Sequence, residues 1–453
     1  MTLANERLTG PATLIKFTSV ACYGVLLGLM TPVLQPMVRG QTVESVTTAN
    51  GPAVEAKKDS VSQEDLKKNW TSFRGFGSNG YATDATPPLS WSAKQSKNIV
   101  WKTPIAKHGM SSPVVWKQRL FLTGADDESR DIYCFDTETG KLVWEHAVNG
   151  LPDSPADGLL PEVLEETGFA APTVATNGQF IAAVFATGEL VCVDMKGQRV
   201  WAKHLGTPNN HYGHASSLIC NRDLLFVQYD QKKDSKLLAF EMATGKPAWQ
   251  VVRDEMSWSS PILVENNDRA ELILTDNKSV CSYNPKTGKR YWRVECLDSE
   301  VAPSAAYGGG IVFVAVENSA ASAIDIRNHA EEPKILWQWD ESLPDSASPL
   351  ATDNYVILPT AFGVVTCLDS KSGKVFWEHE FNQGFCSSPI LVNDRVYIID
   401  ISGNMHVFKL GKTFEQLGES DIGEPAYATP AFVGERIYIR GLRHLFCVGE
   451  EVK

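Results

Sequence analysis

The side chains best suited to chemistry do not form a recognisable catalytic or metal-binding motif. His211 and His214 are separated by two residues, which is the spacing of half a metal site. No second pair of ligands is visible, so we expect no bound metal. The acidic run 126–128 lacks the spacing of a calcium loop, and we interpret it as a solvated turn between strands.

Carboxylates offer one enzymatic alternative. A glycoside hydrolase needs two of them at a defined separation across the scissile bond. Glu300, Asp340 and Glu341 are the candidates, but nothing in their spacing pairs them. We therefore assign no catalytic residue and keep a hydrolytic protein as an alternative.

The chain contains nine cysteines, which in an exported protein would suggest disulfides. Four of them occupy the same position of a repeated strand: Cys134, Cys192, Cys367 and Cys447. Equivalent positions in neighbouring repeats lie too far apart for a bridge, which needs Cα atoms within about 7 Å. We expect these to be small buried hydrophobic residues, and one bridge among Cys220, Cys296 and Cys386 stays open.

A sequence repeat must position these side chains. It begins at Ser111, and each unit opens with two small residues and a proline, as in SSPVV, and continues with strands such as RLFLT, IYCFD and TGKLVWE. The opening prolines recur every 40–46 residues from Pro261 to Pro430. Apolar and polar residues alternate as in strands, and this period is typical of propeller blades. In the turn before the fourth strand, an Asp can accept backbone hydrogen bonds and a Gly can supply positive φ. We expect the Trp of that strand to pack between blades.

The last unit has only three strands, whereas 98–105 (NIVWKTPI) resembles a fourth strand without the other three. We therefore predict an all-β, eight-bladed β-propeller of four-stranded blades, closed by an N-terminal strand that completes the last blade. Such closure removes exposed strand edges. The predicted domain covers 70–453.

Residues that precede each first strand should surround one mouth of the central channel. Their mixed aromatic and polar character predicts a ligand-binding surface, although they could instead simply fill a narrow channel. The predicted binding residues are His108, Met110, Phe169, His211, Tyr212, His214, Trp258, Glu300, Phe385 and Tyr427.

The N-terminal residues indicate export. Arg7 and Lys16 precede the apolar run 17–30, which is short for a membrane span, so we predict a signal peptide over 1–40. An uncleaved leader would be the one route to membrane contact, and the sequence around Cys22 does not favour lipid attachment. Residues 41–69 are polar and are predicted to be a disordered linker. The expected location is the periplasm or cell envelope, with secretion as an alternative.

The formal net charge is −12, without any cluster of Lys and Arg. Nucleic-acid binding requires a clustered basic surface, so we exclude it as a function. The acidic balance favours solubility, and we expect a monomer.

The segments LVCVD, AFEMATGKPAW, CSYNPKTGKRYW and CLDSKSGKVFW resemble the pyrroloquinoline-quinone (PQQ) repeat family of β-propellers. WTSFRGFGSNG at Trp70 is similar to the N-terminal arm of its exported members. The family includes quinoprotein alcohol dehydrogenases and a non-enzymatic scaffold protein, the outer-membrane protein assembly factor. The dehydrogenases hold PQQ between a Trp and adjacent cysteines, with calcium on Glu and Asn, and adjacent cysteines are missing here.

Together these observations predict a non-catalytic binding or scaffold propeller without a cofactor, which engages a protein or glycan partner at the channel mouth or blade edges. The alternative is a PQQ-dependent dehydrogenase with Trp258 and Glu300 in its pocket.

Overall fold

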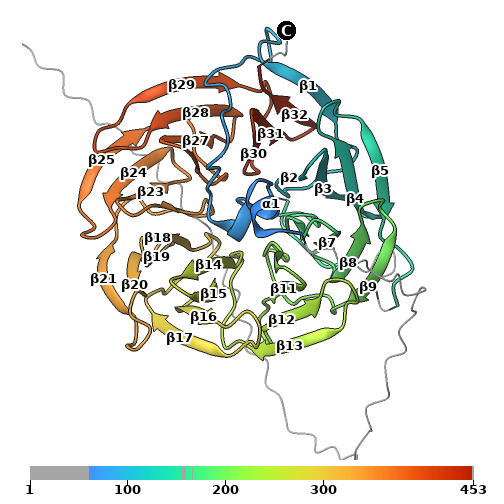
Figure 1. The fold of residues 1–453 in the computed structure, drawn as a ribbon, viewed down its shortest axis with the longest axis horizontal. Coiled ribbons are helices and arrows are strands. Elements are labelled where there is room, and N and C mark those ends of the chain that lie inside the picture. The colour runs from blue at the N-terminus through green and yellow to red at the C-terminus, as the bar shows by residue number, and fades with distance from the viewer. Residues whose placement is uncertain (1–60, 153, 155–159, 166, 451–453) are drawn as a thin grey trace, which may run out of the picture. The chain divides into compact units, whose positions relative to one another are not determined.

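The protein forms eight four-stranded antiparallel sheets arranged radially around a central axis (Figure 1). The computed structural model describes residues 61–152, 154, 160–165 and 167–450. The eight-bladed propeller predicted from the repeat is confirmed. The predicted signal peptide and most of the predicted linker lie outside the described residues.

Each of the first seven blades is one continuous stretch of chain, and we number the blades in chain order. Blade 1 contains β2 (Val114–Trp116), β3 (Arg119–Ala125), β4 (Arg130–Asp136) and β5 (Leu142–Ala147). Blade 2 contains β6 (Ala175–Thr176), β7 (Phe180–Val184), β8 (Glu189–Asp194) and β9 (Arg199–His204). Blade 3 contains β10 (Ile219–Asn221), β11 (Leu224–Tyr229), β12 (Lys236–Glu241) and β13 (Pro247–Val252). Blade 4 contains β14 (Ile262–Asn266), β15 (Arg269–Thr275), β16 (Ser279–Tyr283) and β17 (Arg290–Glu295).

The remaining blades follow the same order from the axis outward. Blade 5 contains β18 (Ala306–Gly308), β19 (Ile311–Ala315), β20 (Ala321–Asp325) and β21 (Lys334–Trp339). Blade 6 contains β22 (Leu350–Ala351), β23 (Tyr355–Pro359), β24 (Val364–Asp369) and β25 (Val375–Glu380). Blade 7 contains β26 (Ile390–Val392), β27 (Arg395–Ile399), β28 (Asn404–Lys409) and β29 (Gln416–Asp421). Blade 8 contains β30 (Ala431–Val433), β31 (Arg436–Arg440) and β32 (His444–Val448), with β1 (Ile99–Pro104) as its outer strand.

β1 closes the ring as predicted. It pairs antiparallel with β32, and the register sets Trp101 opposite Cys447 and Pro104 opposite His444. Beyond the strand, the Ile105 amide donates to the Arg443 carbonyl (2.9 Å). The edge of β32 is therefore covered by a segment more than three hundred residues away in the chain.

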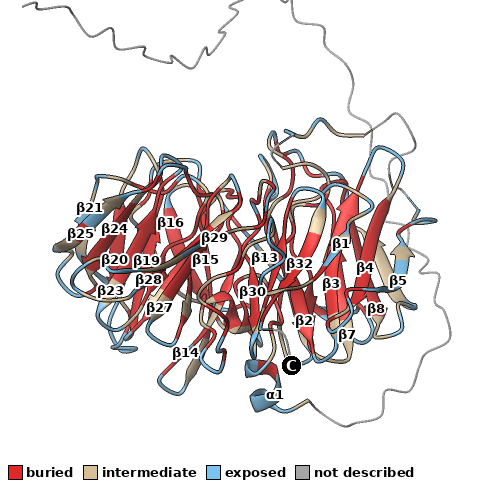
Figure 2. Cartoon of the chain, turned by 90° about the horizontal axis from the view of Figure 1, so that it is seen from above, coloured by how far each residue is buried: buried red, intermediate tan, exposed pale blue. Residues whose placement is uncertain are grey.

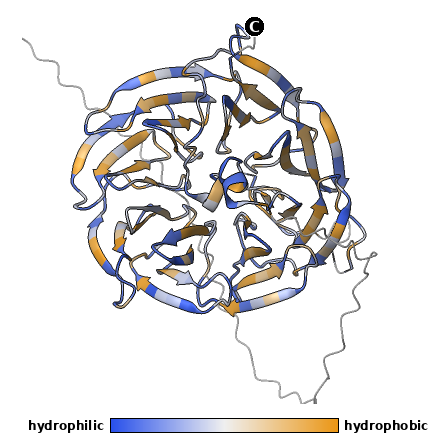
Figure 3. Ribbon diagram, in the orientation of Figure 1, coloured by the Kyte–Doolittle hydropathy of each residue, from blue (hydrophilic) through white to orange (hydrophobic). Residues whose placement is uncertain are grey.

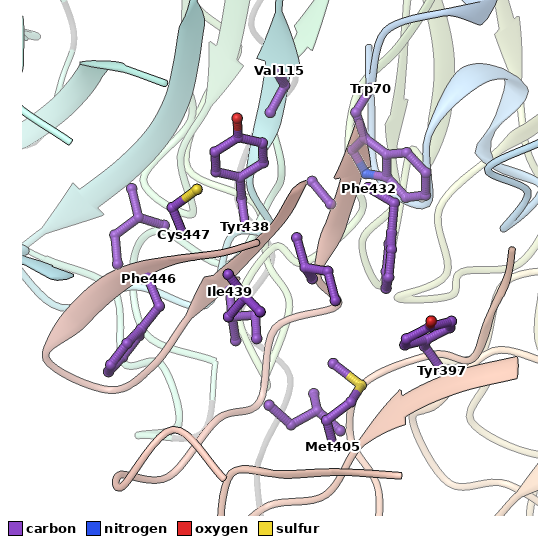
Figure 4. Close-up of a cluster of buried hydrophobic side chains, with 14 of the residues drawn as sticks. Trp70, Val115, Tyr397, Met405, Phe432, Tyr438, Ile439, Phe446 and Cys447 are labelled. Carbon is purple, nitrogen blue, oxygen red and sulfur yellow. The ribbon is translucent and has the colours of Figure 1, made fainter. Parts of the chain in front are cut away.

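The hydrophobic core lies between neighbouring blades. Second and third strands such as β3 and β4 are almost wholly buried, whereas the outer strand β5 alternates between exposed and half-buried residues (Figures 2 and 3). Strands packed between two blades are apolar on both faces, because each face meets a neighbour. Between blades 7 and 8, Trp101 and Tyr438 of blade 8 belong to the same cluster as Tyr397 of blade 7, and Figure 4 shows part of it.

Six seams share one contact between a tryptophan and a glycine turn or loop. The indole N–H of the outer strand donates to a backbone carbonyl of the next blade at 2.8–3.1 Å; the residues are Trp101, Trp144, Trp201, Trp249, Trp337 and Trp377. In the turns, the Asp136 carboxylate accepts backbone N–H bonds, and Gly140 has φ +67°. A Cβ on Gly140 would lie 2.6 Å from Trp101, so glycine is required by packing as well as by conformation. Trp292 differs, because it donates to the buried carboxylate of Glu271 in its own blade (2.8 Å).

A belt of hydroxyl groups explains the two small residues that open each unit. In seven seams the backbone N–H of one blade donates to a hydroxyl of the next at 2.9–3.1 Å, through Ser112, Thr173, Ser217, Ser260, Ser304, Ser348, Ser388 and Thr429. All eight are buried. Proline directly follows Ser112, Ser260, Ser348, Ser388 and Thr429, and it lacks an N–H that would need a partner. The belt fixes the first strands around the channel and thereby the loops at its mouth.

The N-terminal arm, residues 70–86, hydrogen-bonds to the first strands of several blades and to their turns, near the central axis (Figure 1). Trp70 exchanges backbone hydrogen bonds with Val115, and Arg74 is buried and donates to the carbonyls of Ala305 and Pro349. Just before it, α1 (Gln63–Lys67) begins after Ser62, whose hydroxyl accepts from the Asp65 amide, and it buries Leu66. The short 3₁₀ helix η1 (Phe76–Ser78) follows. The predicted linker is therefore ordered at its C-terminal end, because Leu66 packs into the core between blades 1 and 2.

The eight cysteines in the described part of the chain are all free, so the bridge left open among Cys220, Cys296 and Cys386 does not form. Burial raises the pKa of Cys134 and Cys367 to about 12, consistent with buried hydrophobic roles. Over the same residues, no helix is long and apolar enough to cross a bilayer.

Candidate functional site

One end of the channel is formed by the loops that lead from the fourth strand of each blade to the first strand of the next. We call this end the binding mouth. Two described residues between β5 and β6, Val163 and Gly168, lie here too, because a Cβ on Gly213 would meet Val163 and one on Gly168 would meet His108. A groove of about 570 Å³ opens at the same end between blades 4 and 5, lined in part by Lys278, Leu297 and Gln338.

Four predicted residues form one cluster at the binding mouth, which we call the Trp258 cluster: His211, Tyr212, Trp258 and Glu300. The Tyr212 hydroxyl donates to Glu300 Oε2 (3.0 Å), and His211 Nε2 lies 3.2 Å from Glu300 Oε1. The Trp258 ring meets His211 and Tyr212 edge-on, with centroids 5.2 and 4.9 Å apart. The hydrogen bond to Glu300 is the main reason that the pKa of Tyr212 is raised.

Three successive blade connections position this cluster. His211 and Tyr212 follow β9, Trp258 follows β13, and Glu300 follows β17. The indole N–H of Trp258 donates to Asn210 Oδ1 (2.7 Å), and its backbone N–H donates to the Val301 carbonyl (2.8 Å). Trp258 is therefore fixed from both neighbouring loops, while His211 and Glu300 remain exposed.

Three predicted binding residues are buried: Trp258, His214 and Phe385. His214 is 1% exposed and packs on Tyr229, and Phe385 is 0% exposed and packs edge-on against Phe381. Burial lowers the pKa of His214 to about 4, so this imidazole is neutral at physiological pH. His211 is exposed, whereas His214 is buried against Tyr229, so the two imidazoles that suggested half a metal site lie in different surroundings.

The remaining predicted residues lie near two seams, the one between blades 8 and 1 and the one between blades 1 and 2. Met110 and Tyr427 line a small hollow together with Arg440. His108 is exposed at the same end, and burial followed by the charge of Arg440 lowers its pKa. Phe169 is half-buried under the guanidinium of Arg130, 4.8 Å from its ring centroid.

Arg440 was not predicted from the sequence. It is buried, and its Nη1 donates to the Ser111 carbonyl (3.2 Å), the Ser111 hydroxyl (2.6 Å) and the Thr123 carbonyl (2.9 Å). It thus bridges blades 8 and 1. The signal in the sequence was a charged residue at the end of β31, where the strand is otherwise buried. The repeat pattern alone did not draw attention to this residue.

The Trp258 cluster does not fit a quinone cofactor. A flat ring system stacks on a free aromatic face, but Trp258 is only 7% exposed and meets the rings of His211 and Tyr212. The cluster does not fit hydrolysis either, because Glu300 interacts with His211 and Tyr212 rather than with Asp340 or Glu341 within the described residues. Rigid aromatic rings beside exposed polar groups are instead typical of protein-binding surfaces.

Comparison with known protein families matches residues 53–227 and 329–440 to a family model described as outer membrane protein assembly factor BamB. A BamB from Shewanella oneidensis is 23% identical over 304 residues, which cover 65% of this chain and 69% of the relative. A BamB from Yersinia pestis is 23% identical over 269 residues, which cover 55% of this chain and 66% of the relative.

Solved structures share the fold. BamB from Moraxella catarrhalis superposes with a TM-score of 0.58 at 12% identity, covering 78% of this chain and 97% of that one. A quinohemoprotein alcohol dehydrogenase from Pseudomonas putida superposes with a TM-score of 0.64 at 12% identity, covering 87% and 83%. At this identity the likeness establishes the propeller and leaves the activity open.

Proposed function

The chain belongs to the family of the outer membrane protein assembly factor BamB, and from this membership we propose that it is a non-catalytic, protein-binding propeller of the cell envelope. Its partner is a protein involved in outer-membrane assembly, as the names of its relatives suggest. A glycan partner is the less favoured alternative. The proposal includes export to the periplasmic side of the envelope and action as a monomer without a cofactor.

The observation that carries this proposal is the Trp258 cluster. Tyr212 is held by its hydrogen bond to Glu300 and packs against the buried ring of Trp258, so little side-chain entropy is lost when a partner covers Tyr212. His211 and Glu300 supply a polar rim around them, and the neighbouring groove between blades 4 and 5 widens the surface.

Site-specific photo-cross-linking tests the proposal. A photoreactive amino acid at Tyr212 should cross-link a component of the outer-membrane assembly machinery in the native host. The matched position is Lys371, which is exposed in a turn at the opposite end of the propeller and should give no such product. Equal yields at both positions, or no product at Tyr212, would refute binding at this mouth.

The dehydrogenase alternative is checked on the same purified protein. With added PQQ and calcium, a dye-linked alcohol oxidation assay should show no turnover. Turnover that depends on PQQ would replace the scaffold proposal with a quinoprotein function.

A further inference from the structure

Arg440 has hydrogen-bond donors that the fold does not use. Its three hydrogen bonds all come from Nη1, and within the described residues Nε and Nη2 have no hydrogen-bond partner. The hydrogen bonds that join blades 8 and 1 therefore use only the Nη1 group of Arg440. The Nη2 side of the guanidinium lies against Gly109, where a Cβ would be 2.8 Å away.

The charge of Arg440 is also unpaired. No carboxylate of the described chain forms an ion pair with it, although the residue is only 3% exposed. Glu424, which lies beside Gly441, is already engaged by the His444 ring (2.6 Å) and by the amides of Arg443 and His444. Burial is the main reason that the pKa of Arg440 is lowered to about 9. A buried charge without a partner is costly, and an anion would offset that cost.

The repeat itself sets Arg440 apart. The strand registers place seven other residues in the same slot of the second strand: Thr123, Val184, Gln228, Thr275, Ala315, Pro359 and Ile399. None of them is charged, so packing in this slot does not require a guanidinium. Arg440 is therefore a departure from the repeat at the binding mouth.

The surroundings of Arg440 define the size and character of a ligand group. The hollow beside it is lined by Gly109, Met110, Tyr427, Ala428, Gly441 and Leu442. Its volume of about 10 Å³ admits one oxygen-sized atom. The rim is apolar and open to solvent, since Tyr427 is 36% and Leu442 42% exposed.

We propose that Arg440 binds a carboxylate of a partner polypeptide, with one carboxylate oxygen in the hollow and an adjoining apolar side chain on Tyr427 and Leu442. Charge-assisted bonds from a guanidinium to a carboxylate are strong and directional. The inference rests on the proposed function, because it assigns the carboxylate to a protein partner. Its source is either a chain terminus or an acidic side chain.

Titration with small probes tests this directly. The amide resonances of Gly109 and Gly441 are followed by NMR as N-acetyl-leucine, N-acetyl-leucinamide or N-acetyl-Glu-Leu-amide is added. We expect saturable shifts with N-acetyl-leucine and at least tenfold weaker binding of the neutral leucinamide, about 1.4 kcal/mol. The third probe identifies the source, because binding comparable to that of N-acetyl-leucine indicates that an acidic side chain also suffices.

The substitution Arg440→Met keeps the length of the side chain and should remove the preference for the carboxylate. Arg119→Met, in β3 at the opposite end, is the matched control and should keep it. If Arg440→Met does not fold, the two leucine probes on the unaltered protein still decide. Equal binding of N-acetyl-leucine and N-acetyl-leucinamide would overturn the inference, and so would the absence of a saturable shift with either carboxylate probe. A failed cross-link at Tyr212 together with intact probe binding would count against the proposed function alone.

Discussion

At the scale of single residues, the contact between Trp201 and Gly245 determines how closely blades 2 and 3 can pack. Gly245 has φ +68°, and a Cβ there would lie 2.6 Å from the indole. Gly434 has a similar φ of +57° but no atom within 4 Å of the same position, so it isolates the backbone cost. Gly434→Ala should cost about 1 kcal/mol and Gly245→Ala about 1–3 kcal/mol more, because the indole must move.

Urea unfolding of the two glycine variants measures this difference. Equal losses of unfolding free energy would mean that only the turn conformation matters. In that case the Trp–Gly contact would not stabilise the seams.

At the scale of elements, β1 is the strand whose pairing closes the ring. The bond from the Ile105 amide to Arg443 and the alternation of an antiparallel ladder direct the Thr103 amide toward β32 and the Lys102 amide toward solvent. Pro104 fits this pattern, because its position needs no N–H donor. Thr103→Pro should therefore cost about 2–4 kcal/mol, and Lys102→Pro should cost much less.

Thermal unfolding of both proline variants checks the role of β1. Thr103→Ala is measured alongside them, since it separates the loss of the Thr103 hydroxyl bond to Gly140 (2.8 Å) from the effect of the ladder. Similar melting temperatures for the two proline variants would contradict closure through β1.

The sequence predicted the elements better than the site. Repeated prolines, glycines and tryptophans predicted eight blades and the role of residues 98–105, because each blade must meet the same packing demands. The Trp258 cluster was predicted only as a set of candidates, since its contacts depend on how three separate loops fold. His214 was misplaced because its position before β10 does not reveal that its ring turns inward onto Tyr229. The small residues of the hydroxyl belt were visible as a motif in the sequence. Their role could not be predicted, because it depends on which backbone amide lies opposite which hydroxyl.

At the scale of the whole molecule, stability should fall in mild acid. The His214 pKa is lowered to about 4 in the folded state, whereas an unfolded histidine titrates near 6.5. The unfolded state therefore binds more protons between these values, and stability is lost as pH falls from about 6.5 toward 4. The pKa of Asp400 is raised by burial, but hydrogen bonds from His406 and Asn404 outweigh this and lower it, which adds a loss at still lower pH.

Unfolding free energies at pH 7.5 and 5.0 test this assignment in two histidine variants. His214→Gln should reduce the difference between the two pH values, by roughly 1–3 kcal/mol. His211→Gln, at an exposed position of the same loop, is the control for replacing a histidine outside the core. An unchanged difference in His214→Gln would show that other groups govern the acid response.

The N-terminal arm changes how the propeller would respond to a pull on its leading segment. Residues 70–86 hydrogen-bond to inner-strand residues or turns of blades 1, 2, 5, 6, 7 and 8, and Asn79 reaches blade 4. A force applied ahead of Trp70 would thus be distributed over several blades through the hydrogen bonds of the N-terminal arm. The pairing of β1 with β32, which closes the ring, would bear this force only after the hydrogen bonds of the arm had broken.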